Sequence, residues 1–325
     1  QVSPDASHIE PPVDRPSNDW GTDIHGALAL PDGSVVFNFE YMGMVKLDRC
    51  GSVQWILPRM THHSIAPAES GGFWVGSRNF VADSSRYPPL VTPYHDDTIL
   101  RVSPQGEVLS EISVLKLFFD NDLQSILLAN GQFNVSVRSG LEVVHLNDIE
   151  ELETQRAHLF PLFAPGDLLL SLRHMNLVMV VSPETGEVKW HRTGPYIRQH
   201  DPDFTSRGTI TVFDNNSDDS QGRVFGGSRI LEVDPETGEG KVLLGGGKDQ
   251  AMYNEVRGKH QNLPNGNILI TETLGGRVFE VTQSGAIVWE LINRFDEDEV
   301  ARLNDAIRYP DGYFTVEDWS CGNRT

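Results

Sequence analysis

This chain of 325 residues is short of long apolar runs, of positive charge and of cysteine. No run of about 18 apolar residues occurs, so we expect no segment to span a membrane. Lysine and arginine total 26 against 46 acidic residues, which gives a formal net charge of -20. Nucleic-acid binding needs a basic surface that displaces counterions, so this class of partner is excluded. The excess acid is expected on a solvated surface.

A hairpin pattern repeats along the chain. Five segments alternate apolar and polar residues and then reach a turn glycine, over residues 45–51, 100–106, 179–186, 231–238 and 279–285. Most of them follow another hairpin, with turns such as Pro31-Asp-Gly33 and Pro310-Asp-Gly312. Two hairpins make a four-stranded blade, and units about 40 to 60 residues apart are typical of a β-propeller.

A polar residue recurs at one place in these units. His25, His63 and His200 each stand eight residues before a turn glycine. The slots on the six inner strands are filled by His25, His63, His145, His200, His260 and Asn304. If the blades surround an axis, these side chains converge at its centre.

We therefore predict an all-β, six-bladed β-propeller over residues 21–325, preceded by an extended, proline-rich linker over residues 1–20. The sixth blade is short, because only two strands are recognisable in it. The stretch 114–119 between two blades is apolar and fits either a strand or a short helix.

The two cysteines are placed at the ends of the predicted ring. Cys50 falls in the outer turn of blade one, and Cys321 ends blade six, its neighbour in a closed circle. A disulfide between them would close the ring and would indicate an oxidising compartment. The alternative is two unrelated thiols.

Polar residues also stand where the second strands end, at the same edge as the histidines. They are Arg78, Arg173, Asn147, Thr271 and Thr273. Guanidinium, amide and hydroxyl donors match the oxygens of a small tetrahedral oxyanion, and a histidine beside them can act as nucleophile or proton carrier. We expect His260 and Arg78 to contribute to this binding site.

Several motifs resemble those of the bacterial arylsulfotransferase (arylsulfate sulfotransferase) family, which takes sulfate from an aryl ester rather than from the nucleotide donor PAPS. They are His145-Leu-Asn147, Ser171-Leu-Arg173-His174, Gln199-His200-Asp201 and the stretch 263–270, in the family's order. The resemblance covers roughly residues 140–290.

The resemblance implies a ping-pong enzyme without cofactor or metal, acting on an aryl sulfate donor and a phenolic acceptor. By motif position, His200 is similar to the histidine that attacks sulfur and becomes sulfated. His145, Asn147 and Arg173 are similar to the groups that hold the sulfuryl oxygens. His63 matches the histidine that exchanges a proton with the phenol, and His25 occupies the equivalent slot of its blade.

The resemblance also implies that Thr271 or Thr273 supplies a hydroxyl contact. It further implies a periplasmic or secreted protein, with any membrane anchor lying outside this sequence.

Two other functions fit the same histidines. Imidazoles on a propeller axis could bind a transition metal, as in oxygenases that hold iron with four histidines. Such sites usually have carboxylates that hydrogen-bond to the metal-binding histidines, whereas the strand ends here offer arginine and amides. The positive charge of Arg173 would also oppose binding of a dication. The other alternative is a non-catalytic propeller that binds a small anionic ligand.

Overall fold

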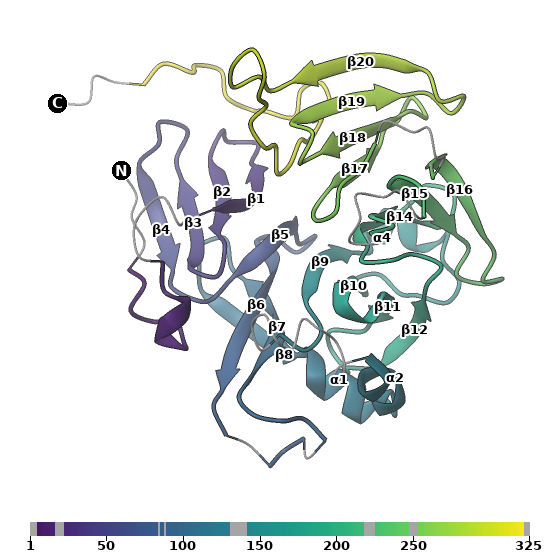
Figure 1. Cartoon of the computed structure of the whole chain (residues 1–325). Helices are drawn as coiled ribbons and strands as arrows, with labels where there is room; N and C mark the ends of the chain where they lie inside the picture. Colours follow the sequence, from purple (N-terminus) through teal and green to yellow (C-terminus); the bar gives the residue numbers. More distant parts are fainter. Residues whose placement is uncertain are drawn as a thin grey trace.

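The computed structural model describes residues 5–16, 23–83, 85–87, 89–130, 142–217, 225–246 and 252–321. Over these residues the strands form five antiparallel sheets of four strands each, arranged around a centre (Figure 1). Each sheet is a blade built from consecutive strands, so the chain visits the blades in sequence order.

The strand bounds are as follows. Blade one contains β1 (Ile24–Ala29), β2 (Val35–Phe39), β3 (Gly43–Leu47) and β4 (Val53–Leu57). Blade two contains β5 (His62–Pro67), β6 (Phe73–Val81), β7 (Tyr94–Val102) and β8 (Val108–Ser113). Blade three contains β9 (Leu146–Glu151), β10 (Leu168–Leu172), β11 (Leu177–Val181) and β12 (Val188–Thr193). Blade four contains β13 (His200–Phe204), β14 (Ile210–Asp214), β15 (Arg229–Val233) and β16 (Gly240–Gly245). Blade five contains β17 (Lys259–Asn262), β18 (Ile268–Glu272), β19 (Arg277–Val281) and β20 (Ile287–Ile292).

The five predicted outer hairpins are all present. They join β3 to β4, β7 to β8, β11 to β12, β15 to β16 and β19 to β20. In the first of them, the N–H of Gly51 donates to the carbonyl of Asp48 at 2.8 Å, with Gly51 at φ 78°. Glycine takes this left-handed conformation at little cost, so its spacing in the sequence predicts the turns correctly.

In the described part of the chain, two short helices lie between blades two and three. The stretch left open between strand and helix forms α1 (Val114–Asp120), whose first turn is capped by the Ser113 hydroxyl accepting from Lys116 N–H at 3.0 Å. It is followed by α2 (Gln124–Asn130). Leu115 and Phe118 of α1 are buried in the core cluster between blades two and three. Other short helices of the described residues are η1 (Pro12–Asp14) before blade one, and α4 (Thr154–Ala157) and η3 (Arg173–Met175) within blade three.

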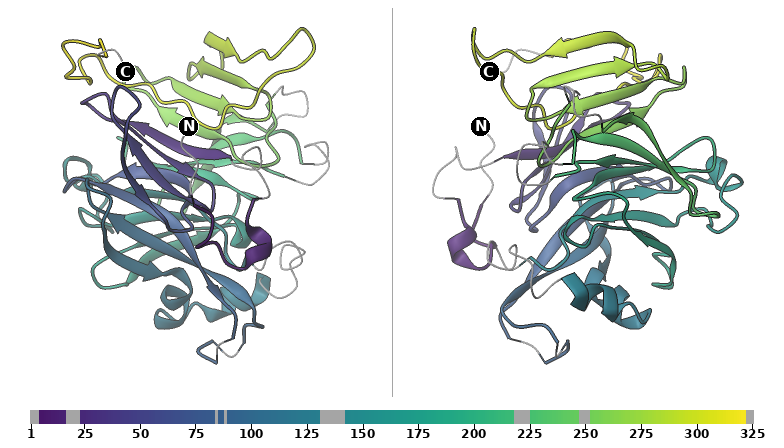
Figure 2. Two further views of the ribbon diagram at one scale, coloured as in Figure 1. Left: turned by 90° about the vertical axis from the view of Figure 1, so that its left-hand side faces the viewer. Right: turned by 45° about the vertical axis from the view of Figure 1, so that its right-hand side comes forward.

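The inner strands β1, β5, β9, β13 and β17 lie against one another in that order around the centre. Between blade five and blade one runs the carboxyl-terminal segment 295–321, seen from two sides in Figure 2. Arg308 N–H donates to Gln261 of blade five at 2.8 Å, and the Tyr309 hydroxyl accepts from Ala29 N–H of blade one at 2.8 Å. A disulfide joins Cys50 to Cys321, so the hypothesis of a bridge that ties the two ends of the ring is confirmed.

The prediction of six blades is wrong, because the structure has five. Segment 295–321, which contains Asn304 and the expected turn at Gly312, forms no named strand. Its backbone bonds go to both neighbours, from Ala301 N–H to the Asn293 carbonyl after blade five and from Thr315 N–H to the Pro31 carbonyl of blade one, at 2.8 Å each. A lone two-stranded hairpin is marginal in water, and without outer strands this one has no sheet to join.

Part of the predicted linker lies against blade one. Of residues 1–20 the structure describes 5–16. Ile9 is fully buried there with Phe37, Phe39 and Met42. No helix in the described part of the chain is long and apolar enough to cross a membrane.

Candidate functional site

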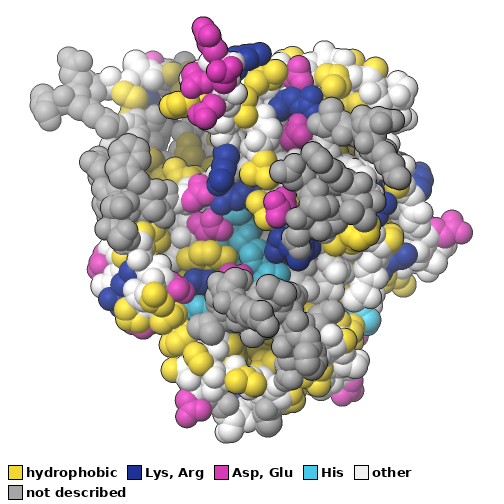
Figure 3. All heavy atoms as spheres, in the orientation of Figure 1, with side chains coloured by type: hydrophobic (Ala, Val, Ile, Leu, Met, Phe, Trp, Pro, Cys, Tyr) yellow, Lys and Arg dark blue, Asp and Glu magenta, His cyan; other side chains and the backbone are white. Residues whose placement is uncertain are grey.

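Four of the predicted histidines meet where the inner strands converge. They are His25 on β1, His63 on β5, His145 immediately before β9, and His200 at the start of β13. Ring centroids are 4.4 Å apart for His25 and His63 and 4.9 Å apart for His63 and His145. Figure 3 shows histidine side chains gathered at the centre of this face. We call these four residues the histidine ring.

Irregular backbone at the ends of the inner strands aims these side chains inward. In blades one to four, the pairing of the inner strand with its neighbour shifts register at the site end. The residues with positive φ there are Gly26 at 81°, His63 at 56°, His145 at 57° and Asp201 at 51°. Such bulges break the alternation of a strand and re-aim a side chain. Each non-glycine residue in this region costs on the order of 1–3 kcal/mol, a strain typical of functional sites.

Asn215 sets the tautomer of His200. The Asn215 side-chain nitrogen donates to the carbonyls of Asn254 at 2.9 Å and Arg257 at 2.7 Å. Its oxygen must therefore face Nδ1 of His200, 2.7 Å away, and accept a proton from it. The neutral ring then carries its lone pair on Nε2, which accepts Arg257 N–H at 3.2 Å. Nε2 is thus the nucleophilic nitrogen of His200.

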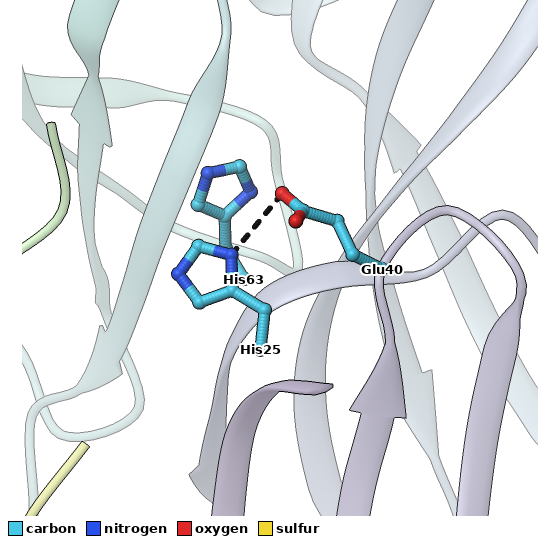
Figure 4. Close-up of side chains that lie close together, drawn as sticks. All are labelled: His25, Glu40 and His63. Carbon is cyan, nitrogen blue, oxygen red and sulfur yellow. Dashed lines mark hydrogen bonds and ion pairs between the residues drawn. The ribbon is translucent and has the colours of Figure 1, made fainter. Parts of the chain in front are cut away.

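Carboxylates stand behind two other members of the ring. Glu40 Oε1 lies 3.1 Å from Nδ1 of His25 (Figure 4), and Glu142 Oε2 lies 2.7 Å from Nδ1 of His145. The expectation that the strand ends offer arginine and amides instead of carboxylates is wrong for blade one, because Glu40 directly follows β2. Glu142 precedes β9 and lies outside these strand ends.

Burial keeps the imidazoles neutral. Desolvation lowers the pKa of His200 and His63 far below the ordinary 6.5, and the charge of Arg173 lowers that of His200 further. Burial also lowers the pKa of His25, and that of His174 to about 3. Although burial opposes ionisation of Glu142, nearby His145 outweighs it and the pKa of Glu142 is lowered. His25, His63, His174 and His200 are therefore neutral at neutral pH, whereas Glu142 is ionised.

The two predicted arginines differ in position. Arg173 opens η3 and lies close enough to His200 to lower the pKa of that ring. Arg78 lies behind the histidine ring. Its guanidinium donates to Glu142 and Asp14 at 3.2 Å each and stacks 3.7 Å from the centre of the Tyr41 side chain. Arg78 therefore holds Glu142, which in turn holds His145.

Asn147 is buried beside the ring. Its Nδ2 donates to the Gln199 carbonyl at 2.8 Å, next to His200 in the chain. Among the described residues its Oδ1 has no hydrogen-bond partner. One amide proton and the oxygen are left to meet a ligand.

His260 does not join the histidine ring. Its Nδ1 lies 3.1 Å from Asp201 and its Nε2 lies 2.8 Å from the Thr211 hydroxyl. The reason is the backbone, since β17 pairs with β18 in unbroken register and has no bulge to turn the side chain inward. Both ring nitrogens are used in joining blade four to blade five.

The two threonines lie at the end of β18. The Thr271 carbonyl accepts from Asn254 Nδ2 at 3.5 Å, so Thr271 supports the residue that holds Asn215. The buried Thr273 hydroxyl has no hydrogen-bond partner in the described part of the chain.

Sequence reasoning missed several residues of the site. His62 touches His63 with ring centroids 5.0 Å apart, and His174 lies 4.7 Å from His145. Each stands next to a residue that was selected, so the His62-His63 and Arg173-His174 doublets were signals for them. Glu40 stands seven residues after the turn glycine Gly33, which is the slot that Arg78, Arg173 and Thr273 fill in their blades, so the repeat could have marked it. Glu142 has no such position.

Side chains of the types that bind metals gather in three separate groups among the described residues. The groups are His25, Glu40 and His63; Glu142, His145 and His174; and Asp201, Asp203 and His260. Within each group the candidate ligand atoms lie within 4.8 Å of one another, and no group contains His200. The four members of the histidine ring therefore do not form a four-imidazole metal site.

Comparison with known proteins agrees with this architecture. The model of the arylsulfotransferase (ASST) family matches residues 26–294. A search of curated proteins found no match. Among solved structures, a protein of unknown function from Bacteroides caccae is similar at 14% identity and a TM-score of 0.53, covering 83% of this chain and 82% of that one. Virginiamycin B lyase from Staphylococcus aureus is similar at 13% identity and a TM-score of 0.47, covering 83% and 69%. At 14% identity the similarity to the first structure concerns the fold alone, and nothing about this chain is inferred from the second.

Proposed function

Because the chain belongs to the arylsulfotransferase family, we propose that it transfers a sulfuryl group from an aryl sulfate to a phenol through a sulfated His200. The observation that carries the proposal is the contact between Asn215 and His200. It leaves the lone pair of His200 on Nε2, and burial keeps the ring neutral and nucleophilic.

In the first half-reaction, Nε2 of His200 gives up its hydrogen bond from Arg257 N–H and forms a bond to sulfur, while the bond from sulfur to the aryl oxygen breaks. The departing phenolate takes a proton from the protonated form of His63, which becomes neutral and which burial makes a strong acid. Arg173, His145 and the remaining amide proton of Asn147 stabilise the three sulfuryl oxygens, since donors fixed around a developing charge contribute most to such a transfer.

The second half-reaction reverses these steps with another phenol. The acceptor gives its proton to His63, its oxygen bonds to sulfur, and the bond from sulfur to Nε2 breaks. His63 thus ends each cycle carrying the proton it began with. His25, whose ring lies 4.4 Å from that of His63, is the alternative proton carrier.

Turnover of a chromogenic aryl sulfate with a phenolic acceptor tests this function. Incubation without acceptor should leave an acid-labile sulfuryl group on His200, located by mass spectrometry. His200→Ala and His200→Asn should both abolish the label and turnover, because an amide copies the hydrogen bonds but cannot attack sulfur. A label on another residue, or normal turnover by His200→Ala, would show the assignment to be wrong.

Metal catalysis is the second candidate, and the carboxylates behind His25 and His145 favour it because metal-binding histidines are commonly oriented this way. Metal analysis of the purified active protein separates the two. One equivalent of iron, zinc or copper that is required for activity would favour this candidate. Absence of turnover by a metal-replete protein would leave a propeller that binds a small anion.

We also propose that the protein works in the periplasm or outside the cell. The Cys50–Cys321 disulfide supports this location, since such bonds persist in oxidising compartments.

A further inference from the structure

In the proposed reaction the free enzyme must hold the proton of the acceptor phenol until the next aryl sulfate has reacted. His63 must hold a proton after the acceptor phenol has reacted. Desolvation and the neighbouring histidines oppose a positive charge on its ring and lower its pKa far below 6.5. A buried imidazole alone is therefore a poor store for the proton.

His62 lies directly behind His63. The two Nδ1 atoms are 2.9 Å apart and the rings meet edge to face at 88°. Consecutive residues of a strand normally point to opposite faces. Here the register shift between His62 and Ile65 and the φ of 56° at His63 bring both rings to one place. Strained backbone of this kind is kept where the surrounding structure or the function requires it.

A carboxylate stands on the far side of His62. Nε2 of His62 lies 3.4 Å from Oδ1 of Asp97 on β7, and both side chains are almost completely buried. In the described part of the chain this Nε2 has no hydrogen-bond partner, but the Asp97 carboxylate lies within ion-pair distance of it. Asp97 is itself positioned by Leu146 N–H, which donates to Oδ2 at 3.3 Å.

From this geometry we infer that Asp97, His62 and His63 form a relay that stores the proton taken from the acceptor phenol. The inference rests on the proposed function. In the sulfated enzyme, His62 Nε2–H faces Asp97, His62 Nδ1 accepts from His63 Nδ1–H, and the lone pair of His63 lies on Nε2. The phenol proton binds His63 Nε2, the proton between the two rings moves to His62, and the cation ends beside the Asp97 carboxylate. The reverse movement protonates the departing phenolate.

Other charged or titratable groups around the relay serve less well. Tyr41, with its ring 5.1 Å from His62, is kept protonated because burial and Glu142 raise its pKa. Glu40, which faces His25, also binds the Arg257 guanidinium at 3.1 Å, so its charge is shared with a permanent cation. His145 adjoins His63 on the other side and is held by Glu142. His62 and Asp97 are positioning residues, since they act through His63.

The test compares wild type with His62→Gln and Asp97→Asn in single-turnover transfer to a series of phenols. Loss of the relay should slow transfer to weakly acidic phenols by about 10- to 100-fold and transfer to acidic nitrophenols much less, which steepens the dependence of rate on phenol pKa. Ser77→Ala is the control, because its buried hydroxyl has no partner among the described residues and it faces away from His62, whose ring packs against Gly76. Ser77→Ala should keep the wild-type dependence.

A second measurement does not depend on activity. Nitrogen-15 spectra of labelled histidines should show one proton shared by Nδ1 of His62 and Nδ1 of His63, lost in His62→Gln and displaced in Asp97→Asn. If wild type transfers no sulfuryl group but shows this proton, the proposed function fails and the relay stands as a proton-holding pair. Absence of the shared proton, or an unchanged phenol dependence in both variants, would overturn the relay.

Discussion

The α-carbon of Gly26 lies against the backbone of His63. A Cβ atom at Gly26 would come within 2.1 Å of the His63 carbonyl oxygen, and Gly26 has φ 81°. The inner strands of blades one and two therefore meet at the histidine ring itself. A glycine at this position is needed for His25 and His63 to approach to 4.4 Å.

Gly26→Ala should destabilise the fold and separate these two histidines. Both the left-handed φ and the clash with backbone contribute, and we expect a loss above the roughly 1–2 kcal/mol that φ alone costs. Gly285→Ala is the matched control, since it has φ 86° and no atom within 4 Å of the added Cβ. Chemical denaturation of both variants measures the difference, and equal losses would contradict the steric argument.

Asn215→Leu should slow sulfation of His200 by about 10- to 100-fold, because a hydrogen bond of about 1–3 kcal/mol that holds the reactive tautomer is lost. The attachment site should remain His200. Single-turnover labelling with an aryl sulfate measures the rate, and thermal melting checks that the fold persists. A rate equal to wild type in a folded variant would remove Asn215 from the mechanism.

Arg173→Ala should reduce the labelling rate by about 10²- to 10³-fold, as removal of one oxyanion donor commonly does. His200 should still be the labelled residue, since the nucleophile stays in place. Arg173→Lys should recover part of the rate, because a point charge replaces the planar donor. Unchanged labelling by Arg173→Ala would place the oxyanion elsewhere.

Stability should fall as the pH is lowered below about 6.5. The pKa values of His25, His63, His174 and His200 are lowered in the folded protein, so the unfolded chain binds protons first. The contribution of these histidines to stability is therefore fully present above pH 6.5, which is their pKa in the unfolded chain. It is lost as the pH falls from there toward their lowered pKa in the folded protein, by up to about 1.4 kcal/mol per pH unit for each group. His174→Gln should show a shallower fall of Tm between pH 7 and 5, whereas the exposed His158→Gln should not.

Cys50→Ser combined with Cys321→Ser should lower the free energy of unfolding by about 2–4 kcal/mol, because the disulfide closes a separation of 271 residues. Wild type in reductant should melt at the same lowered temperature. The labelling rate of His200 should be unchanged, since Cys50 lies in the outer turn between β3 and β4. Two thiols that alkylate freely in the native protein without reductant would refute the bridge.

Local sequence was enough to predict the hairpins of the five blades but not the number of blades. Turn glycines such as Gly51 and alternating strands such as residues 43–47 are local features, and they produced the hairpins wherever a sheet could form. The segment at Asn304 carries the same local signals, yet it has no outer strands to pair with and forms no blade. Whether a hairpin belongs to a sheet depends on its neighbours.

The sequence by itself determined the family motifs, the five outer hairpins and four histidines that meet at the centre. Tertiary structure decided which of the repeated residues face inward, because bulges at Gly26, His63 and Asp201 depend on packing between blades while β17 has none and turns His260 away. Tertiary structure also decided which groups contact the imidazoles of the site. Glu40 and Glu142 lie only 15 and 3 residues along the chain from the histidines they face. Asp97 instead reaches His62 from another strand of blade two, and Arg257 reaches His200 from 57 residues away. Such contacts depend on how the strands pack, which no periodicity along the chain records.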